Sequence, residues 1–192
     1  GGKVNLVPTT AADRFQLTPA LVEQHWQETT RALMVATPSN PTGTAASADD
    51  LKKMCEFAKA RGAWRIIDEI YLNLSDDTNG PPQSALSFDN DAIIINSFSK
   101  YFGMTGWRLG WMIVPDDMVA VIERLAQNLY ICPSTPAQLA ALACFTPPTL
   151  ALCEQRRESL LSRRKIVLQG LADAGLEVPV EPDGAFYAYI DV

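Results

Sequence analysis

The sequence has very little histidine, since His25 is the only one among 192 residues. A single histidine excludes the H-E-x-x-H zinc motif and argues against any site with several histidine ligands. The four cysteines (Cys55, Cys132, Cys144 and Cys153) are widely spaced and form no C-x-x-C pair. We therefore predict no metal site, and four buried free thiols in a reducing compartment, the cytoplasm.

Positive charge is also scarce: 16 lysines and arginines face 22 acidic residues, for a net charge of −6. The basic clusters at 156–157 and 163–165 fall on one predicted helix, and we interpret them as its solvated face. A net acidic domain binds polyanions poorly, so we expect no nucleic-acid partner. No apolar run approaches the length of a membrane span, so we expect no membrane partner either.

What the sequence has is a regular alternation of short apolar runs with stretches of helical periodicity. This pattern predicts an α/β fold, a mostly parallel sheet flanked by helices. The expected strands are residues 3–7, 31–36, 63–67, 91–96 and 109–114. The expected helices are residues 18–29, a helix that Ser47 caps and Gly62 ends, and 118–131, 135–145 and 149–174, with a surface loop at 76–84.

The last part of the chain is predicted to leave this sheet. We assign residues 1–148 to part of a large domain, and 149–192 to a long linking helix and the start of a smaller α+β domain. Residues 177–180 and 185–190 are expected to be strands of that smaller unit. The chain begins without methionine and ends where a strand finishes, so we expect it to be a portion of a longer protein.

Polar clusters follow three of the predicted strands. The carboxyl ends of neighbouring parallel strands meet at one edge of a sheet, where ligands bind. We therefore expect the three clusters to build one ligand site. They are Ser39-Asn40-Pro41-Thr42-Gly43, Asp68-Glu69-Ile70-Tyr71 and Ser97-Phe98-Ser99-Lys100.

Lys100 lies among aromatic residues directly after a buried strand, although an exposed loop lysine remains an alternative. Partial burial beside an arginine favours the neutral amine, which can attack an aldehyde. Arg108 follows in Gly106-Trp107-Arg108-Leu109-Gly110. A guanidinium and nearby serine hydroxyls suit a phosphate, while a structural pairing of Arg108 with Asp116 or Asp117 stays open.

Asp68 ends an apolar strand, where an unpaired carboxylate would be costly. It could cap a helix or bond a loop amide. Alternatively, it could pair with a protonated ring nitrogen, an attraction of about 4 kcal/mol at roughly 4 Å and an effective dielectric constant near 20. Tyr71 and Asn40 could both hydrogen-bond a phenolic oxygen on the same ring.

Four motifs in this order, N-P-T-G, D-E-x-Y, S-x-S-K and G-x-R-x-G, resemble those of the class I/II aminotransferases of the aspartate aminotransferase superfamily, fold type I. The resemblance implies a pyridoxal 5'-phosphate cofactor and transfer of an amino group between an amino acid and a 2-keto acid. It also implies a homodimer and a chain about twice this length.

Carried onto this sequence, the resemblance implies that Lys100 forms a Schiff base with the cofactor and later moves the α-proton. It implies that Asp68 pairs with the ring nitrogen. The remaining implied contacts are Asn40 and Tyr71 with the ring hydroxyl, Ser97, Ser99 and Arg108 with the phosphate, and Asn40 with the substrate carboxylate.

Three other functions were weighed against this one. Ser97-x-x-Lys100 matches the S-x-x-K of serine penicillin-recognising enzymes, but the S-D-N and K-T-G motifs of that mechanism are absent from the sequence. A pyridoxal-phosphate lyase or decarboxylase would use the same Schiff base. A non-catalytic aminotransferase-like effector module of a transcription regulator would bind the cofactor without turnover.

Overall fold

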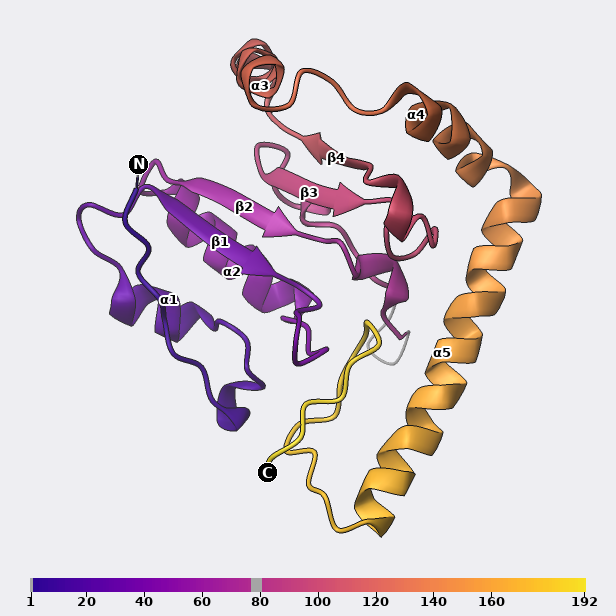
Figure 1. Ribbon diagram of the computed structural model, residues 1–192. Coiled ribbons are helices and arrows are strands. Elements are labelled where there is room, and N and C mark those ends of the chain that lie inside the picture. The colour runs from indigo at the N-terminus through magenta and orange to yellow at the C-terminus, as the bar shows by residue number, and fades with distance from the viewer. Residues whose placement is uncertain (1, 77–80) are drawn as a thin grey trace.

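The computed structural model describes residues 2–76 and 81–192 and contains a four-stranded sheet (Figure 1). Its strands lie in the order β1 (Ala32–Ala36), β2 (Trp64–Asp68), β3 (Ile93–Ser97) and β4 (Gly110–Ile113). The first three are parallel, and β4 is antiparallel to β3. The predicted α/β fold with a mostly parallel sheet is thus confirmed. β4 reverses direction because residues 98–109 supply only a 3-10 turn, Thr105–Trp107, and no crossover helix.

The described residues form five α-helices around this sheet or beside it. They are α1 (Pro19–His25), α2 (Ala48–Lys59), α3 (Asp116–Leu129), α4 (Thr135–Leu142) and α5 (Pro147–Asp173). Further 3-10 turns span Ala11–Asp13, Leu72–Leu74, Ala85–Ser87 and Ala143–Phe145. The Thr18 and Ser47 side chains accept hydrogen bonds from the third residue on, so both helices begin where the capping signals predict. The first helix ends at His25, earlier than expected.

The main core lies between one face of the sheet and α2, which runs behind β1 and β2 in Figure 1. In β1 the side chains alternate, with Leu33 and Val35 buried and Met34 63% exposed. Met54 of α2 is fully buried against this face. The alternation fixes which residues of each strand face the core, while the parallel pairing of β1, β2 and β3 aligns their carboxyl ends at one edge.

One charged pair is buried in this core. The Arg65 guanidinium donates to both oxygens of Asp89, at 2.7 and 2.9 Å, and to the Ala63 carbonyl at 3.1 Å. Lys59 lies 3.6 Å from the same carboxylate. Burial would raise the pKa of Asp89, but the bonds from Arg65 and the charges of Arg65 and Lys59 outweigh it and hold that pKa below its usual value.

The two strands predicted near the C-terminus are wrong. Residues 176–192 pair only through one isolated bridge, Glu177 with Asp191. The segment instead lies between α5 and the carboxyl ends of β1 and β2 (Figure 1). Its backbone binds the Asn40 loop, since the Asp183 and Gly184 N–H groups both donate to the Gly43 carbonyl at 3.0 Å. These two N–H groups therefore find their acceptor in the loop rather than in a partner strand.

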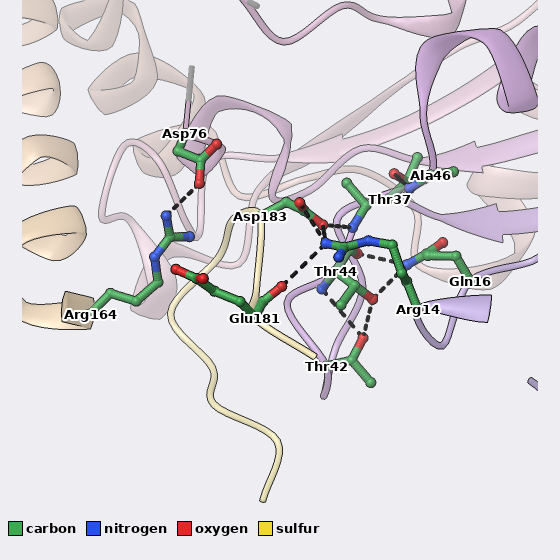
Figure 2. A network of polar contacts seen from close by, with 11 residues as sticks. Arg14, Gln16, Thr37, Thr42, Thr44, Ala46, Asp76, Arg164, Glu181 and Asp183 are labelled. Atoms are coloured by element: carbon green, nitrogen blue, oxygen red, sulfur yellow. Dashed lines mark hydrogen bonds and ion pairs between the residues drawn. The ribbon is translucent and has the colours of Figure 1, made fainter. Parts of the chain in front are cut away.

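Side chains reinforce this contact (Figure 2). Arg14 donates to both Asp183 oxygens at 2.8 Å and to the Glu181 carbonyl at 3.2 Å, and Asp183 also accepts from the Ala45 N–H. Gly43, at φ +69°, leaves no room for a side chain, since a Cβ there would lie 2.7 Å from Pro182. The C-terminal segment is therefore anchored on the loop that follows β1.

Two other expectations fail. Residues 3–7 form no strand in the described chain: Val4 and Leu6 are more than 80% exposed, and the segment pairs with none of the four strands. An apolar run cannot remain a strand without a neighbouring backbone to pair with. Cys132 is exposed in the turn between α3 and α4, whereas the three other cysteines are free and buried as expected.

The predicted last helix is not merely solvated along its basic face. Arg157 and Arg164 are partly buried, and Arg164 forms an ion pair with Asp76 (Figure 2). Part of the predicted loop at 76–84, residues 77–80, lies outside the described residues. The domain division at 148 and 149, inside the first turn of α5, stays a prediction.

Among the described residues, no single helix is long and apolar enough to cross a membrane. Helices 135–145 and 147–173 pass that test only as a pair, bent by 83°.

Candidate active site

A cavity of about 430 Å³ opens at the carboxyl ends of β1, β2 and β3. It brings together all seven residues singled out in the sequence, from three separate loops. Its lining comprises Ala36, Pro38, Asn40, Asp68, Ile70, Tyr71, Ser97, Ser99, Lys100, Thr105 and Arg108. The convergence follows from the parallel pairing of the three strands, which aligns their ends.

Lys100 lies in the turn after β3, half-buried, with its side chain in the cavity. Its Nζ is 5.3 Å from the ring centre of Tyr71 and 5.4 Å from that of Phe186. The centres of these two rings are themselves 5.6 Å apart, so the amine lies against an aromatic corner rather than in open solvent. The alternative of an exposed loop lysine therefore does not describe its surroundings.

Asp68 is the last residue of β2, and its carboxylate is half-buried at the cavity wall. Its Oδ1 accepts a hydrogen bond from the Ile70 N–H at 3.1 Å, the loop-amide contact left open by the sequence. Within residues 2–76 and 81–192, this carboxylate makes no ion pair. Most of its capacity to accept hydrogen bonds is thus available to a ligand.

The end of β3 forms a pre-shaped polar loop. The Ser97 hydroxyl donates to the Leu109 carbonyl at 3.1 Å and accepts from the Ser99 N–H at 3.0 Å. Thr105 Oγ1 in turn donates to the Ser99 carbonyl at 2.7 Å. These bonds hold the two serines beside each other before any ligand binds.

Arg108 lies at the rim of this loop and is exposed. One guanidinium nitrogen donates to the Thr105 carbonyl at 2.9 Å, which leaves four N–H donors. The pairing with Asp116 or Asp117 is not found in the described part of the chain. The guanidinium thus faces the cavity together with the serine loop.

The loop that carries Asn40 is braced by a chain of hydroxyl groups (Figure 2). Thr42 bonds the Ser39 hydroxyl at 2.6 Å and the Thr44 hydroxyl at 2.8 Å, and Gln16 donates to the Thr44 carbonyl at 2.7 Å. Asn40 itself is exposed at the cavity. The bracing fixes the loop while it leaves the Asn40 side chain accessible.

Side chains of α5 form hydrogen bonds with the segments that follow β2 and β3. The Tyr101 hydroxyl, next to Lys100, donates to Glu154, which accepts from Arg157 Nε at 2.8 Å. Arg157 also donates to the Ser75 carbonyl at 3.0 Å, in the segment that follows Tyr71. Burial, followed by the bond to Glu154, raises the pKa of Tyr101, so this phenol stays protonated and keeps donating.

Sequence reasoning missed two aromatic residues of the C-terminal segment at this site. Tyr187 lies with its hydroxyl 2.6 Å from that of Tyr71, and the Phe186 ring lies over Lys100. The sequence predicts a strand for the stretch that contains Gly184-Ala185-Phe186-Tyr187. No local pattern could have placed it here, because the contact joins residues 116 positions apart.

Thr105 was also missed, although it belongs to the stretch between the S-x-S-K and G-x-R-x-G motifs. Its position in that stretch was the available signal. As for metals, the described residues contain no group of three or more His, Cys, Asp or Glu side chains arranged to hold an ion.

Comparison with known proteins bears on this geometry. The family model described as aminotransferase class I and II matches residues 1–192. A valine–pyruvate aminotransferase of Mycobacterium tuberculosis is 36% identical over 100% of this chain and 49% of its own length. An aspartate aminotransferase of Streptomyces avermitilis is 34% identical over 86% of this chain and 41% of its own.

Solved structures agree. The crystal structure of an aminotransferase from Mycobacterium tuberculosis superposes with a TM-score of 0.89, at 36% identity, over 97% of this chain and 48% of that one. Aspartate aminotransferase from Thermus thermophilus with maleate gives 0.89 at 31% identity, over 96% and 48%. The chain spans about half the length of the curated relatives it matches. The four motifs, the strand-end cavity and the match along its whole length together make this chain a member of the class I and II aminotransferases.

Proposed function

We propose that this chain belongs to a pyridoxal-phosphate-dependent aminotransferase that moves an amino group between an amino acid and a 2-keto acid. The observation that carries the proposal is the composition of the 430 Å³ cavity. An amine, a carboxylate and a serine–arginine group come from the ends of adjacent strands and face one space. The volume lies in the range of small-molecule sites, about 300–1,000 Å³.

The donors and acceptors of the cavity fit the parts of this cofactor. Lys100 offers an amine for its aldehyde, and Asp68 offers a carboxylate with free acceptor capacity for a protonated ring nitrogen. Ser97, Ser99 and Arg108 also line the cavity, where a phosphate would find N–H and O–H donors. Members of the family use pyridoxal phosphate.

The cofactor, when bound, supplies an electron sink for negative charge that develops at the α-carbon of an amino acid. The chain's own residues would do the rest. Asp68 would keep a proton on the ring nitrogen through an ion pair worth about 4 kcal/mol at roughly 4 Å and an effective dielectric constant near 20. Lys100 Nζ would bind the aldehyde and, once released, take up and return the α-proton.

The other residues would orient the cofactor and the substrate. Asn40 and Tyr71 would hydrogen-bond the ring hydroxyl, and Asn40 would also contact the substrate carboxylate. Tyr71 is suited to this because it is buried yet lines the cavity. Contacts of this kind would align the bond between the α-carbon and its hydrogen for proton removal.

We also propose the setting of the reaction. The partners would be an amino acid and a 2-keto acid, with the protein acting as a homodimer in the cytoplasm. Free thiols, three of them buried, support a reducing compartment. The net charge of −6 argues against a nucleic-acid partner. We propose no membrane partner.

The test is to bind pyridoxal phosphate to the protein, reduce it with borohydride and locate the label by mass spectrometry. We expect the label on the peptide that contains Lys100, and we expect Lys100→Ala to remove both the label and the visible absorbance of the bound cofactor. Lys165→Ala, which removes an amine far along α5, serves as the control. A label and an absorbance band unchanged in Lys100→Ala would contradict the assignment.

Product analysis then separates the remaining alternatives. Formation of a new amino acid together with a keto acid identifies transamination. Release of ammonia with a keto acid, or of CO2, identifies a lyase or a decarboxylase. Cofactor binding without any product is the outcome expected for a non-catalytic effector module.

A further inference from the structure

Tyr71, which lines the cavity, pairs its phenol group with that of Tyr187 from a distant part of the chain. The Tyr71 hydroxyl, after β2, and the Tyr187 hydroxyl, in the C-terminal segment, are 2.6 Å apart. Their rings pack edge to face with centres 5.6 Å apart. Tyr71 is only 4% exposed and Tyr187 is half-buried, so water competes poorly for this bond.

A phenol carries only one hydrogen, and this limits what the pair can do. If Tyr71 donates to Tyr187, it offers the cavity a lone pair and no hydrogen. If Tyr187 donates to Tyr71, the Tyr71 hydrogen is free to point into the cavity. Only the second arrangement lets Tyr71 donate to an oxygen anion on a ligand.

The role proposed for Tyr71 needs the second arrangement: Tyr71 lines the cavity, and it can donate to the ring hydroxyl oxygen of the ligand only if its single hydrogen is not used on Tyr187. Burial is the largest cause that raises the pKa of the Tyr187 phenol, and the hydrogen bond with Tyr71 is the next. The charge of Lys100 offsets part of this rise. A raised pKa keeps the Tyr187 phenol protonated, so it has a hydrogen to donate to Tyr71.

We propose that Tyr187 is a positioning residue for the cofactor: it donates to the Tyr71 oxygen and thereby turns the single Tyr71 hydrogen toward the ring hydroxyl oxygen of the ligand. The inference rests on the proposed function, and it adds to it a residue from the segment beyond α5. The contact of that segment with the Asn40 loop, at Gly43, thereby also affects how the cofactor is bound.

A double-mutant cycle tests whether Tyr187 acts through Tyr71. Pyridoxal phosphate affinity is measured by equilibrium dialysis for the parent, Tyr187→Phe, Tyr71→Phe and the double variant. We expect Tyr187→Phe to raise the Kd about three- to tenfold, the net worth of one neutral hydrogen bond. In the Tyr71→Phe background the same change should alter the Kd by less than about twofold.

Tyr189→Phe is the matched control, because it removes a phenol from the same segment at an exposed position packed on Phe15. It should leave the Kd unchanged. An equal loss from Tyr187→Phe in both backgrounds, or no loss in the parent background, would overturn the positioning role.

A second measurement needs no cofactor. Carbon-13 NMR of labelled tyrosine rings follows the ionisation of Tyr187, identified by the signal lost in Tyr187→Phe. Because Tyr187 donates, Tyr71→Phe should lower the pH at which Tyr187 ionises; an unchanged or higher value would overturn the assigned direction. A parent protein that binds no pyridoxal phosphate would overturn the proposed function, whereas a parent that binds it without coupling overturns only the role of Tyr187.

Discussion

Each end of β2 carries a charged side chain, and the two side chains differ in what binds them. In the core, Arg65 is buried and its guanidinium is bound by both oxygens of Asp89. Three residues later, Asp68 is half-buried at the cavity, with a loop amide as its partner. The charge of Arg65 is paired within the chain, whereas the Asp68 carboxylate can still accept hydrogen bonds from a ligand. The first arrangement should govern stability and the second should govern chemistry.

Two neighbouring buried carboxyl groups extend this comparison. Asp89 faces a guanidinium, and its pKa lies below the usual value. Glu69 is equally buried, but its hydrogen-bond donors within residues 2–76 and 81–192 are neutral: the Ala85 N–H at 2.8 Å and the Ser84 hydroxyl at 3.1 Å. Burial therefore raises the pKa of Glu69 despite these two bonds. The partner's charge, rather than burial alone, decides the direction.

Asp68→Asn should give the largest effect, because it removes the proposed charge opposite the ring nitrogen. An ion pair of about 4 kcal/mol corresponds to a loss of about a thousandfold in turnover. The free energy of unfolding of the cofactor-free protein should stay within about 0.5 kcal/mol of the parent, since no charge partner is lost. Steady-state kinetics and urea unfolding measure the two quantities. Turnover equal to that of the parent would remove the proposed role of Asp68.

Asp89→Asn should give the reverse pattern. It leaves the Arg65 guanidinium buried without a counter-charge, which costs about 3–5 kcal/mol of unfolding free energy. Urea unfolding of the cofactor-free protein measures the loss. Asp91→Asn is the matched control, because Asp91 is an exposed carboxylate that also bonds Lys59. A loss no larger than that of the control would show that the buried pair is not the stabilising feature.

The pH dependence of stability should separate Asp89 from Glu69. The folded pKa of Asp89 is lowered, so its contribution is present above about pH 3.9, its unfolded value, and is lost as the pH falls through the folded pKa. The folded pKa of Glu69 is raised, so its contribution is present below about pH 4.3 and is lost as the pH rises through the folded pKa.

Glu69→Gln keeps an acceptor for the Ala85 N–H and removes the titration. We expect its unfolding free energy relative to the parent to be higher at pH 7 than at pH 4, because the parent loses the contribution of Glu69 as the pH rises. Urea unfolding at a series of pH values measures this difference. A flat difference across the range would mean that Glu69 is not held in a site that penalises its charge.

Lys59→Met should give the smallest effect. Its ammonium lies 3.6 Å from Asp89, but more than half of the side chain is exposed and water screens its charge. The urea midpoint should shift far less than in Asp89→Asn. A shift of comparable size would mean that Asp89 depends on both cations rather than on the Arg65 fork.

The candidate site could be predicted from the sequence because its residues follow strand ends. Asn40, Asp68 and Lys100 each come within a few residues of the end of an apolar run, and parallel pairing aligns those ends. The partner of Arg65 could not be predicted in this way, because Asp89 lies 24 residues further along the chain. Its identification needs the distance between side chains rather than their order.

The sequence by itself determined the four strands of the sheet and the polar clusters at their carboxyl ends. Apolar periodicity and capping residues are local signals, and they act within a few residues. Only the tertiary structure decided that residues 3–7 pair with no strand, that β4 runs antiparallel, and that Tyr187 meets Tyr71. A strand requires a second backbone, and a hydrogen bond between distant residues requires the chain to fold back. The periodicity of one segment cannot predict either of these two conditions, because both depend on a second segment of the chain.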